Sequence, residues 1–331
     1  MGSVPETASP LRRGRLLRIA AALSVLLALI GYVVVQYVTG GGAPRCTVRT
    51  AAGEGSTYEL SAEQAANAAT ISAVGTTRGM PERAVTIALA TALQESGLHN
   101  IKHGDRDSLG LFQQRPSKGW GTAGQILDPV YASGKFYEHL AEVPGYSRLP
   151  LTVAAQRVQR SGFPQAYAKH EPDATLLAAA LTGRATRALT CDPGKGDKAG
   201  DPSKVRAELV RAFGPEVLPK AGAPGRTGAP PPREVSVPVR SAIGTDGGGA
   251  AQRGWELAHW AVARADGLRI DEVSYAGRVW SAKESGKGWR AAGATSAETG
   301  ARGSGGNSDT DSHKASGADS RTGEVRIHLA R

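Results

Sequence analysis

An apolar run from Ala84 to Leu93 is the feature that most constrains this chain of 331 residues. Eight of its ten residues are small or aliphatic, and they fall on every face of a helix. A helix that is apolar all round is buried in a protein core. We therefore predict a core helix over residues 81–96, with Pro81 in its first turn and Gly97 as its left-handed C-terminal cap.

Glu95 comes at the end of this predicted helix. Apolar surroundings and the negative end of a helix dipole both disfavour an ionised carboxyl group, so the pKa of Glu95 should be raised. A carboxyl that keeps its proton near neutral pH can protonate a glycosidic oxygen. Asp105 and Asp107 follow in a loop, from which a chain reversal would bring carboxylates back over Glu95.

Four segments in this order resemble the lysozyme-like superfamily of soluble lytic transglycosylases and goose-type lysozymes. They are Glu95-Ser96 at a helix end, Gly104-Asp105-Arg106 in a loop, Gly110-Leu111-Phe112-Gln113, and Asp128-Pro129 leading into Gly134, Tyr137 and Leu140. The resemblance covers about residues 60–175. The Ala-Tyr-Asn signature of the family is absent, and Val158-Gln159-Arg160-Ser161 and Ala166-Tyr167 occupy its region.

The resemblance implies a glycosidase that cleaves the bond between N-acetylmuramic acid and N-acetylglucosamine in peptidoglycan glycan strands. It implies Glu95 as the general acid and Gln113 beside the substrate. Asp105 resembles the water-orienting carboxylate of the goose-type enzymes, which invert by hydrolysis. The lytic transglycosylases instead form a 1,6-anhydro product, and we prefer this reaction while the other stays open.

The other candidate substrate-binding residues are polar or aromatic side chains: Ser96, Ser108, Trp120, Tyr131 and Tyr167. Trp120 lies between two glycines and is the favoured sugar-stacking residue, because aromatic residues at helical spacing are more often core residues. His259, His313 and His328 have no metal-like spacing, so we expect neither a metal nor a cofactor. The Lys and Arg residues do not gather in one stretch, which argues against nucleic-acid binding.

The N-terminal region has the pattern of a membrane anchor. Four arginines and one acid precede residues 19–38, which carry no charge. Twenty helical residues span about 30 Å, the thickness of a bilayer core. We predict a basic cytoplasmic tail at 1–18, a transmembrane helix at 19–38, and a single-pass plasma-membrane protein with its bulk outside. A cleaved signal peptide is the alternative.

The chain has two cysteines, Cys46 and Cys191, at the two ends of the predicted helical domain. In an exported chain such a pair indicates a disulfide. Helices are expected near 61–74, 81–96, 130–141, 151–161 and 172–182, with a capping box at Ser61 and Gln64. The predicted fold class is mainly α, with a lysozyme-like domain over 46–191.

The C-terminal third differs in composition. Residues 192–233 are rich in proline and glycine around an amphipathic patch at 205–213, and predict a linker. Residues 234–331 predict a small α+β module, with a helix at 252–265, strands at 235–239, 270–275, 278–282 and 324–329, and a disordered insert at 291–322. The sequence does not tell what this module binds.

The leading hypothesis is therefore a membrane-anchored extracellular peptidoglycan glycosidase. The alternative is a non-catalytic cell-wall-binding or scaffold protein that keeps the fold without the activity.

Overall fold

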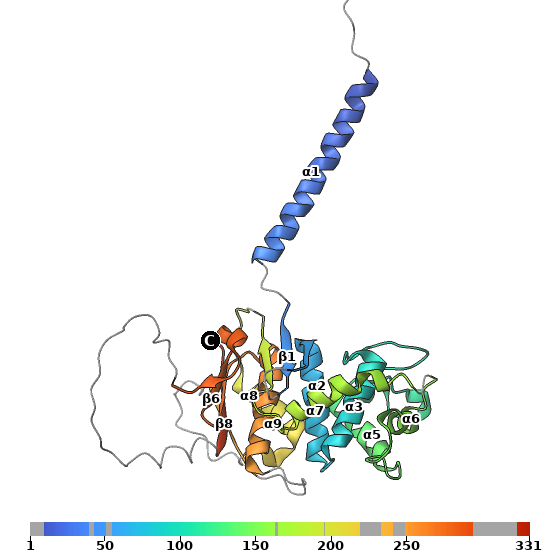
Figure 1. Ribbon diagram of the computed structural model, residues 1–331, viewed down its shortest axis with the longest axis vertical. Helices are drawn as coiled ribbons and strands as arrows, with labels where there is room; N and C mark the ends of the chain where they lie inside the picture. Colours follow the sequence, from blue (N-terminus) through green and yellow to red (C-terminus); the bar gives the residue numbers. More distant parts are fainter. Residues whose placement is uncertain are drawn as a thin grey trace, which may run out of the picture. The chain divides into compact units, whose positions relative to one another are not determined.

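The computed structural model describes residues 10–39, 43–50, 55–162, 165–194, 196–218, 233–240, 249–293 and 323–331 (Figure 1). The chain forms two compact units, residues 1–43 and 44–331. The first contains helix α1, Pro10–Thr39. Residues 1–9 of the predicted basic tail lie outside the described residues.

The predicted membrane anchor needs correction. Within the described part of the chain, no helix is long and apolar enough to cross a membrane. The structure therefore does not support the transmembrane helix predicted at residues 19–38.

The second unit contains two antiparallel sheets, so the predicted mainly α fold class is wrong and the protein is α+β. The smaller sheet has the order β2-β1-β3, with β1 at Arg45–Arg49, β2 at Thr57–Ser61 and β3 at Leu189–Asp192. These strands have only four or five residues, too few to establish a period of two. One of the two partners of β1, strand β3, also lies far along the chain, so no local pattern indicates that pairing.

The larger sheet has the order β4-β8-β5-β6-β7. Its strands are β4 Glu234–Pro238, β5 Ile270–Tyr275, β6 Arg278–Ser281, β7 Arg290–Ala291 and β8 Glu324–Leu329. Ala276 and Gly277 join β5 to β6 with positive φ angles of 49° and 69°, as a two-residue hairpin turn requires.

The predicted helices are confirmed with small shifts of their ends. The long ones are α2 Ala62–Thr77, α3 Glu82–Ser96, α5 Pro129–Ala141, α6 Leu151–Gln159, α7 Glu171–Leu181, α8 Pro202–Phe213 and α9 Ala250–Ala263. Two short helices are α4 Ala123–Ile126 and α10 Ala265–Leu268. The capping box of Ser61 and Gln64 begins α2, and Gly97 ends α3 at φ 60° and ψ 30°.

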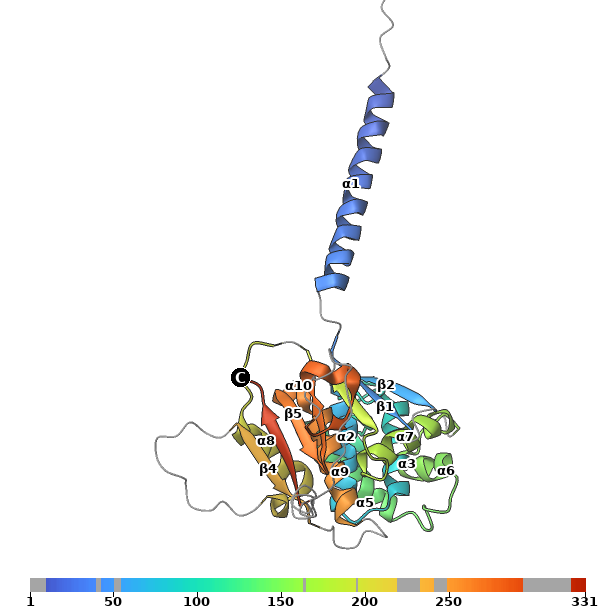
Figure 2. The same ribbon diagram turned by 60° about the vertical axis from the view of Figure 1, so that its left-hand side comes forward.

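Helix α3 is the buried centre of the helical region. It packs against α2, α5, α6 and α7, and its residues from Ala84 to Leu93 are all buried. Figures 1 and 2 show α2, α7 and α9 between the five-stranded sheet and the group of α3, α5 and α6. Helix α9 packs against β5 and β8 on one side and against α2 and α7 on the other.

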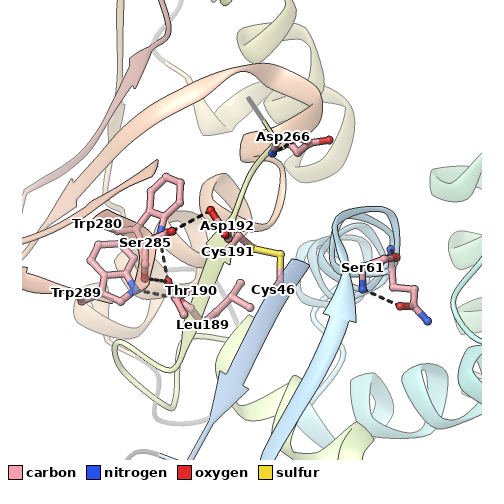
Figure 3. Close-up of a disulfide and its surroundings, with 12 residues drawn as sticks. Cys46, Ser61, Leu189, Thr190, Cys191, Asp192, Asp266, Trp280, Ser285 and Trp289 are labelled. Carbon is pink, nitrogen blue, oxygen red and sulfur yellow. Dashed lines mark hydrogen bonds between the residues drawn. A yellow bond between two sulfur atoms is a disulfide. The ribbon is translucent and has the colours of Figure 1, made fainter. Parts of the chain in front are cut away.

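Strand β3 connects the two regions. Its Cys191 pairs with Cys46 of β1 and forms the predicted disulfide, which is confirmed (Figure 3). On its other side, Trp280 donates a hydrogen bond to Thr190 Oγ1 at 3.1 Å, and Trp289 donates one to the Leu189 carbonyl at 2.8 Å. One short strand therefore contacts both the helical region and the C-terminal segment.

The predicted linker and insert are described only in part. Residues 195 and 219–232 of the linker lie outside the described residues, as do residues 294–322 of the insert. Within the linker, α8 buries Val205, Leu209 and Phe213. Residues 44–331 form one compact unit, and α8 is part of it.

The disulfide allows a test of this architecture. Replacing both Cys46 and Cys191 with Ala should lower the unfolding temperature by about 5–15 °C, because the bridge closes a loop across 145 residues and restricts the unfolded chain. Alanine avoids placing a hydroxyl group at two buried positions. Thermal melting followed by circular dichroism measures the effect. Reductant should lower the melting temperature of the wild type and leave that of the double variant unchanged; equal melting of both proteins without reductant would contradict the expected role.

Candidate active site

The carboxyl group of Glu95 is held half-buried at the end of α3, where the helix emerges from the core. Gly97 ends the helix in the left-handed conformation, which a residue without Cβ adopts without strain. Ser96 is buried, and its hydroxyl donates to the carbonyls of Ala92 at 3.0 Å and Leu111 at 2.7 Å. The helix end is thereby fixed to the segment that follows the Asp105 loop.

Two side chains contact the Glu95 carboxyl group, Gln159 at the end of α6 and Tyr167 in the segment that follows it. The Tyr167 hydroxyl donates to Oε1 at 2.7 Å, and the Gln159 amide also donates a hydrogen bond to the carboxyl. The same amide donates to the Phe112 carbonyl at 2.6 Å, which fixes its position. Both contacts come from the region where the Ala-Tyr-Asn signature is absent, so this chain fills that region with other hydrogen-bonding side chains.

The pKa of Glu95 is raised above its ordinary value. Burial is the largest cause, and the hydrogen bonds from Tyr167 and Gln159 act in the opposite direction because they favour the ionised form. Burial and the neighbouring carboxylate also raise the pKa of Tyr167. The tyrosine therefore stays protonated and donates to Glu95. A carboxyl with a raised pKa and two stable donors can lose its proton and take it back.

A cavity of about 950 Å³ opens over Glu95. Five of the eight predicted catalytic and substrate-binding residues line it: Glu95, Asp105, Ser108, Gln113 and Trp120. The other lining residues were not predicted: Gln114, Arg115, Lys118, His139, Glu142, Val143, Pro144, Arg157, Val158, Gln159, Arg160, Ser161 and Gly162. Most come from α6, from the residues directly after it and from the turn after α5, and no local motif marks them. The position of residues 158–161 in the signature region was the one available signal.

Three predicted residues lie outside the cavity lining. Tyr167 is fully buried and its hydroxyl donates to Glu95, so its ring offers no stacking surface to a ligand. Ser96 has the structural role described above. Tyr131 lies beside the backbone of Gly121, where an added Cβ would be 2.5 Å from the tyrosine hydroxyl.

The segment from Gly104 to Gln114 forms one side of the cavity. Leu111 and Phe112 are fully buried, and Phe112 stacks on Phe136 with ring centroids 4.7 Å apart. Gly110 has φ 75° and approaches the backbone so closely that a Cβ there would lie 2.7 Å from the Ile126 carbonyl oxygen. This anchoring leaves Gln113 at the cavity, with its amide donating to the Gly110 carbonyl at 3.2 Å.

The two loop aspartates differ sharply. Asp107 accepts hydrogen bonds from the Ser117 side chain, from Arg115 at 2.7 Å and from the Ser117 backbone at 2.8 Å, and these bonds hold its pKa well below its usual range. Asp107 therefore fixes the loop. The side chain of Asp105 is 92% exposed, and its nearest cation is Arg106 at 3.9 Å. Asp105 lines the cavity without being held in place.

An aromatic pair lies at the cavity. The rings of Trp120 and His139 have centroids 4.3 Å apart, and both residues line the cavity. Trp120 is partly buried, and a tryptophan ring is the kind of flat apolar surface on which sugar rings stack. In the described part of the chain, no group of three or more His, Cys, Asp or Glu side chains could hold a metal ion.

A family model described as VldE, C-terminal domain, matches residues 236–302. This segment contains α9, α10 and strands β5, β6 and β7, and it includes neither Glu95 nor any residue of the cavity. No curated protein matches the chain.

The hydrogen bond from Tyr167 can be tested directly. Tyr167→Phe removes a donor that favours the ionised carboxyl, so the pKa of Glu95 should rise further. Carbon-13 NMR of glutamate-labelled protein follows the titration, and Glu95→Gln identifies the resonance. Tyr131→Phe is the matched control, because this tyrosine lies outside the cavity lining, and it should leave the titration unchanged. A pKa of Glu95 that falls or does not move in Tyr167→Phe would contradict the assigned contact.

Proposed function

We propose that residues 44–331 form a glycosidase that cleaves the bond between N-acetylmuramic acid and N-acetylglucosamine in peptidoglycan, with a 1,6-anhydro product. The main observation behind this proposal is that the Glu95 carboxyl group has a raised pKa and lies at a large cavity. The resemblance of residues 60–175 to lytic transglycosylases and goose-type lysozymes supports the substrate. Trp120 supports sugar binding, because it lines the same cavity.

The disulfide supports a location outside the cytoplasm. Disulfides persist in oxidising compartments and are rare where thiols are kept reduced. The bond between Cys46 and Cys191 is buried in the second unit, where both residues are at most 4% exposed. We therefore propose that this unit acts outside the cytoplasm, where peptidoglycan lies.

The reaction uses Glu95 twice. The protonated carboxyl gives its proton to the glycosidic oxygen, and the bond from that oxygen to C1 of the muramic residue breaks. The C6 hydroxyl of the same residue then attacks C1, and the Glu95 carboxylate takes the hydroxyl proton. The acid is restored and no water is consumed. The product is lighter by one water than the product of hydrolysis.

The neighbours of Glu95 fit both steps. While the group is a carboxylate, Tyr167 and Gln159 donate to it and reduce the free energy required for ionisation in a buried place. While it is protonated, burial favours that form. Burial and the two hydrogen bonds therefore act in opposite directions on the pKa of Glu95, so that the group can be protonated or ionised. A residue that serves first as an acid and then as a base needs both forms.

The position of Asp105 favours the anhydro reaction over inverting hydrolysis. An inverting enzyme needs a second carboxylate that holds the attacking water on the opposite face of the sugar. Asp105 is 92% exposed, so nothing around it fixes such a position. The C6 hydroxyl of the substrate requires no second carboxylate. A non-catalytic wall-binding protein would not need the buried donors around Glu95, and this favours catalysis.

Two substitutions test the proposal. Glu95→Gln should lower the release of soluble fragments from dye-labelled cell walls by about 10²–10⁴-fold, because the amide has nearly the same size and cannot donate the proton. Asp105→Asn should retain most of the activity. Glu142→Gln is a matched control, because Glu142 is an exposed acid at the same cavity.

Full activity of Glu95→Gln would refute the assigned acid. A loss in Asp105→Asn as severe as in Glu95→Gln would favour the inverting hydrolase. Circular dichroism of each variant distinguishes a lost proton donor from a lost fold.

A further inference from the structure

The charges at the cavity are unevenly compensated. Arg115 is paired with Asp107 at 2.7 Å, and Glu142 lies 3.7 Å from His139. Lys118, Arg157 and Arg160 also line the cavity. Over the residues that the structure describes, the side chains of these three have neither an ion pair nor a hydrogen bond. We call Lys118, Arg157 and Arg160 the cleft cations.

Arg160 is held in an unfavourable backbone conformation. It ends α6 at φ 52° and ψ 39°, in the left-handed region where a side chain introduces strain that glycine avoids. Gly97 meets the same requirement at the end of α3 without strain. Residues with strained backbones are concentrated at functional sites.

Comparison with a second strained arginine shows what is unusual about Arg160. Arg269 has φ 56°, and its guanidinium donates to the backbone carbonyls of Gly194, Gly196 and Lys198. That side chain has a structural role within the protein. The Arg160 side chain makes no such bonds to the described residues and lines the cavity instead. Its charge is therefore available to a ligand.

The proposed substrate carries carboxylates that can pair with the cleft cations. The sugar rings of the glycan are uncharged, but N-acetylmuramic acid carries a lactyl ether with a carboxyl group. That carboxyl is either free or extended by a peptide with carboxylates of its own. Guanidinium groups bind carboxylates with two parallel hydrogen bonds, and lysine binds them as a point charge.

We propose that Lys118, Arg157 and Arg160 bind the carboxylates carried by muramic acid residues, and that they make the site select anionic glycan over uncharged glycan. This inference rests on the proposed function and specifies its substrate. The cleft cations thereby determine the substrate specificity of the site. An uncharged polymer of N-acetylglucosamine fits the sugar-binding surfaces, but it leaves the cleft cations without a partner. Their interaction with anionic ligands weakens as salt concentration rises.

Calorimetric binding tests the inference in the Glu95→Gln background, where turnover does not consume the ligand. Three soluble ligands of equal sugar number are compared: oligomers of N-acetylglucosamine, glycan with free lactyl carboxyls, and glycan with intact peptides. Both anionic ligands should bind about three- to tenfold more tightly than the uncharged one at low salt. Salt should reduce this difference. The ratio between the two anionic ligands identifies which carboxylates are recognised.

Arg160→Gly is the decisive variant, because it removes the charge and relieves the backbone strain together. It should weaken the binding of anionic glycan and leave the uncharged ligand unaffected, while the unfolding temperature stays equal or rises. Arg187→Gly is its matched control. Arg187 has φ 57°, is exposed and lies outside the cavity, so its replacement changes the same charge and the same strain. It should alter no affinity.

Arg157→Gln and Lys118→Gln should act on anionic ligands in the same direction as Arg160→Gly. Equal binding of all three ligands by the parent protein, or an equal effect of Arg160→Gly on all three, would overturn the inference and leave the proposed function standing. Failure to bind any of the three glycans would overturn the proposed function and this inference with it.

Discussion

The burial of one helix determines the properties of the candidate site. Helix α3 is apolar on every face, so it needs packing partners all round, and α2, α5, α6 and α7 provide them. Glu95 lies where this buried helix reaches the cavity. Burial of the apolar residues stabilises the helix in this position. The same position places the Glu95 carboxyl group in surroundings that disfavour its charge. The raised pKa of Glu95 is a consequence of the core.

Strand β3 links the helical region that contains α3 to the C-terminal segment. The same four residues carry the disulfide to β1 and accept hydrogen bonds from Trp280 and Trp289. A change at β3 therefore affects both the small sheet and the contacts of the five-stranded sheet. The segment matched by the VldE C-terminal domain model packs through α9 against α2 and α7, the helices next to α3. It supports the helical core from outside the cavity.

The sequence predicted those structural features that are formed by residues only a few positions apart. The capping box of Ser61, the glycine cap at Gly97 and the hairpin turn at Ala276 each involve residues within a few positions, and all are present. The mainly α fold class failed because β1 and β3 pair across the chain. The absence of charge over residues 19–38 predicted a membrane span that the structure does not support.

At the candidate site too, contacts between neighbouring residues were easier to predict than contacts between distant ones. The place of Glu95 at the end of a buried helix could be predicted, because the run before it is apolar on every face and Gly97 ends the helix. Tyr167 was predicted for a different role, as a substrate-binding residue, although its hydroxyl bonds to Glu95 from 72 positions away. The cleft cations come from two distant segments and carry no motif of their own. Only the tertiary structure gathers them at one cavity.

The most direct test of the central claim is the mass of the soluble products that the wild-type protein releases from purified cell-wall glycan. The account predicts muramic acid ends that are lighter by one water than reducing ends, because the C6 hydroxyl replaces water as the nucleophile. Products that all carry reducing muramic ends would contradict this mechanism.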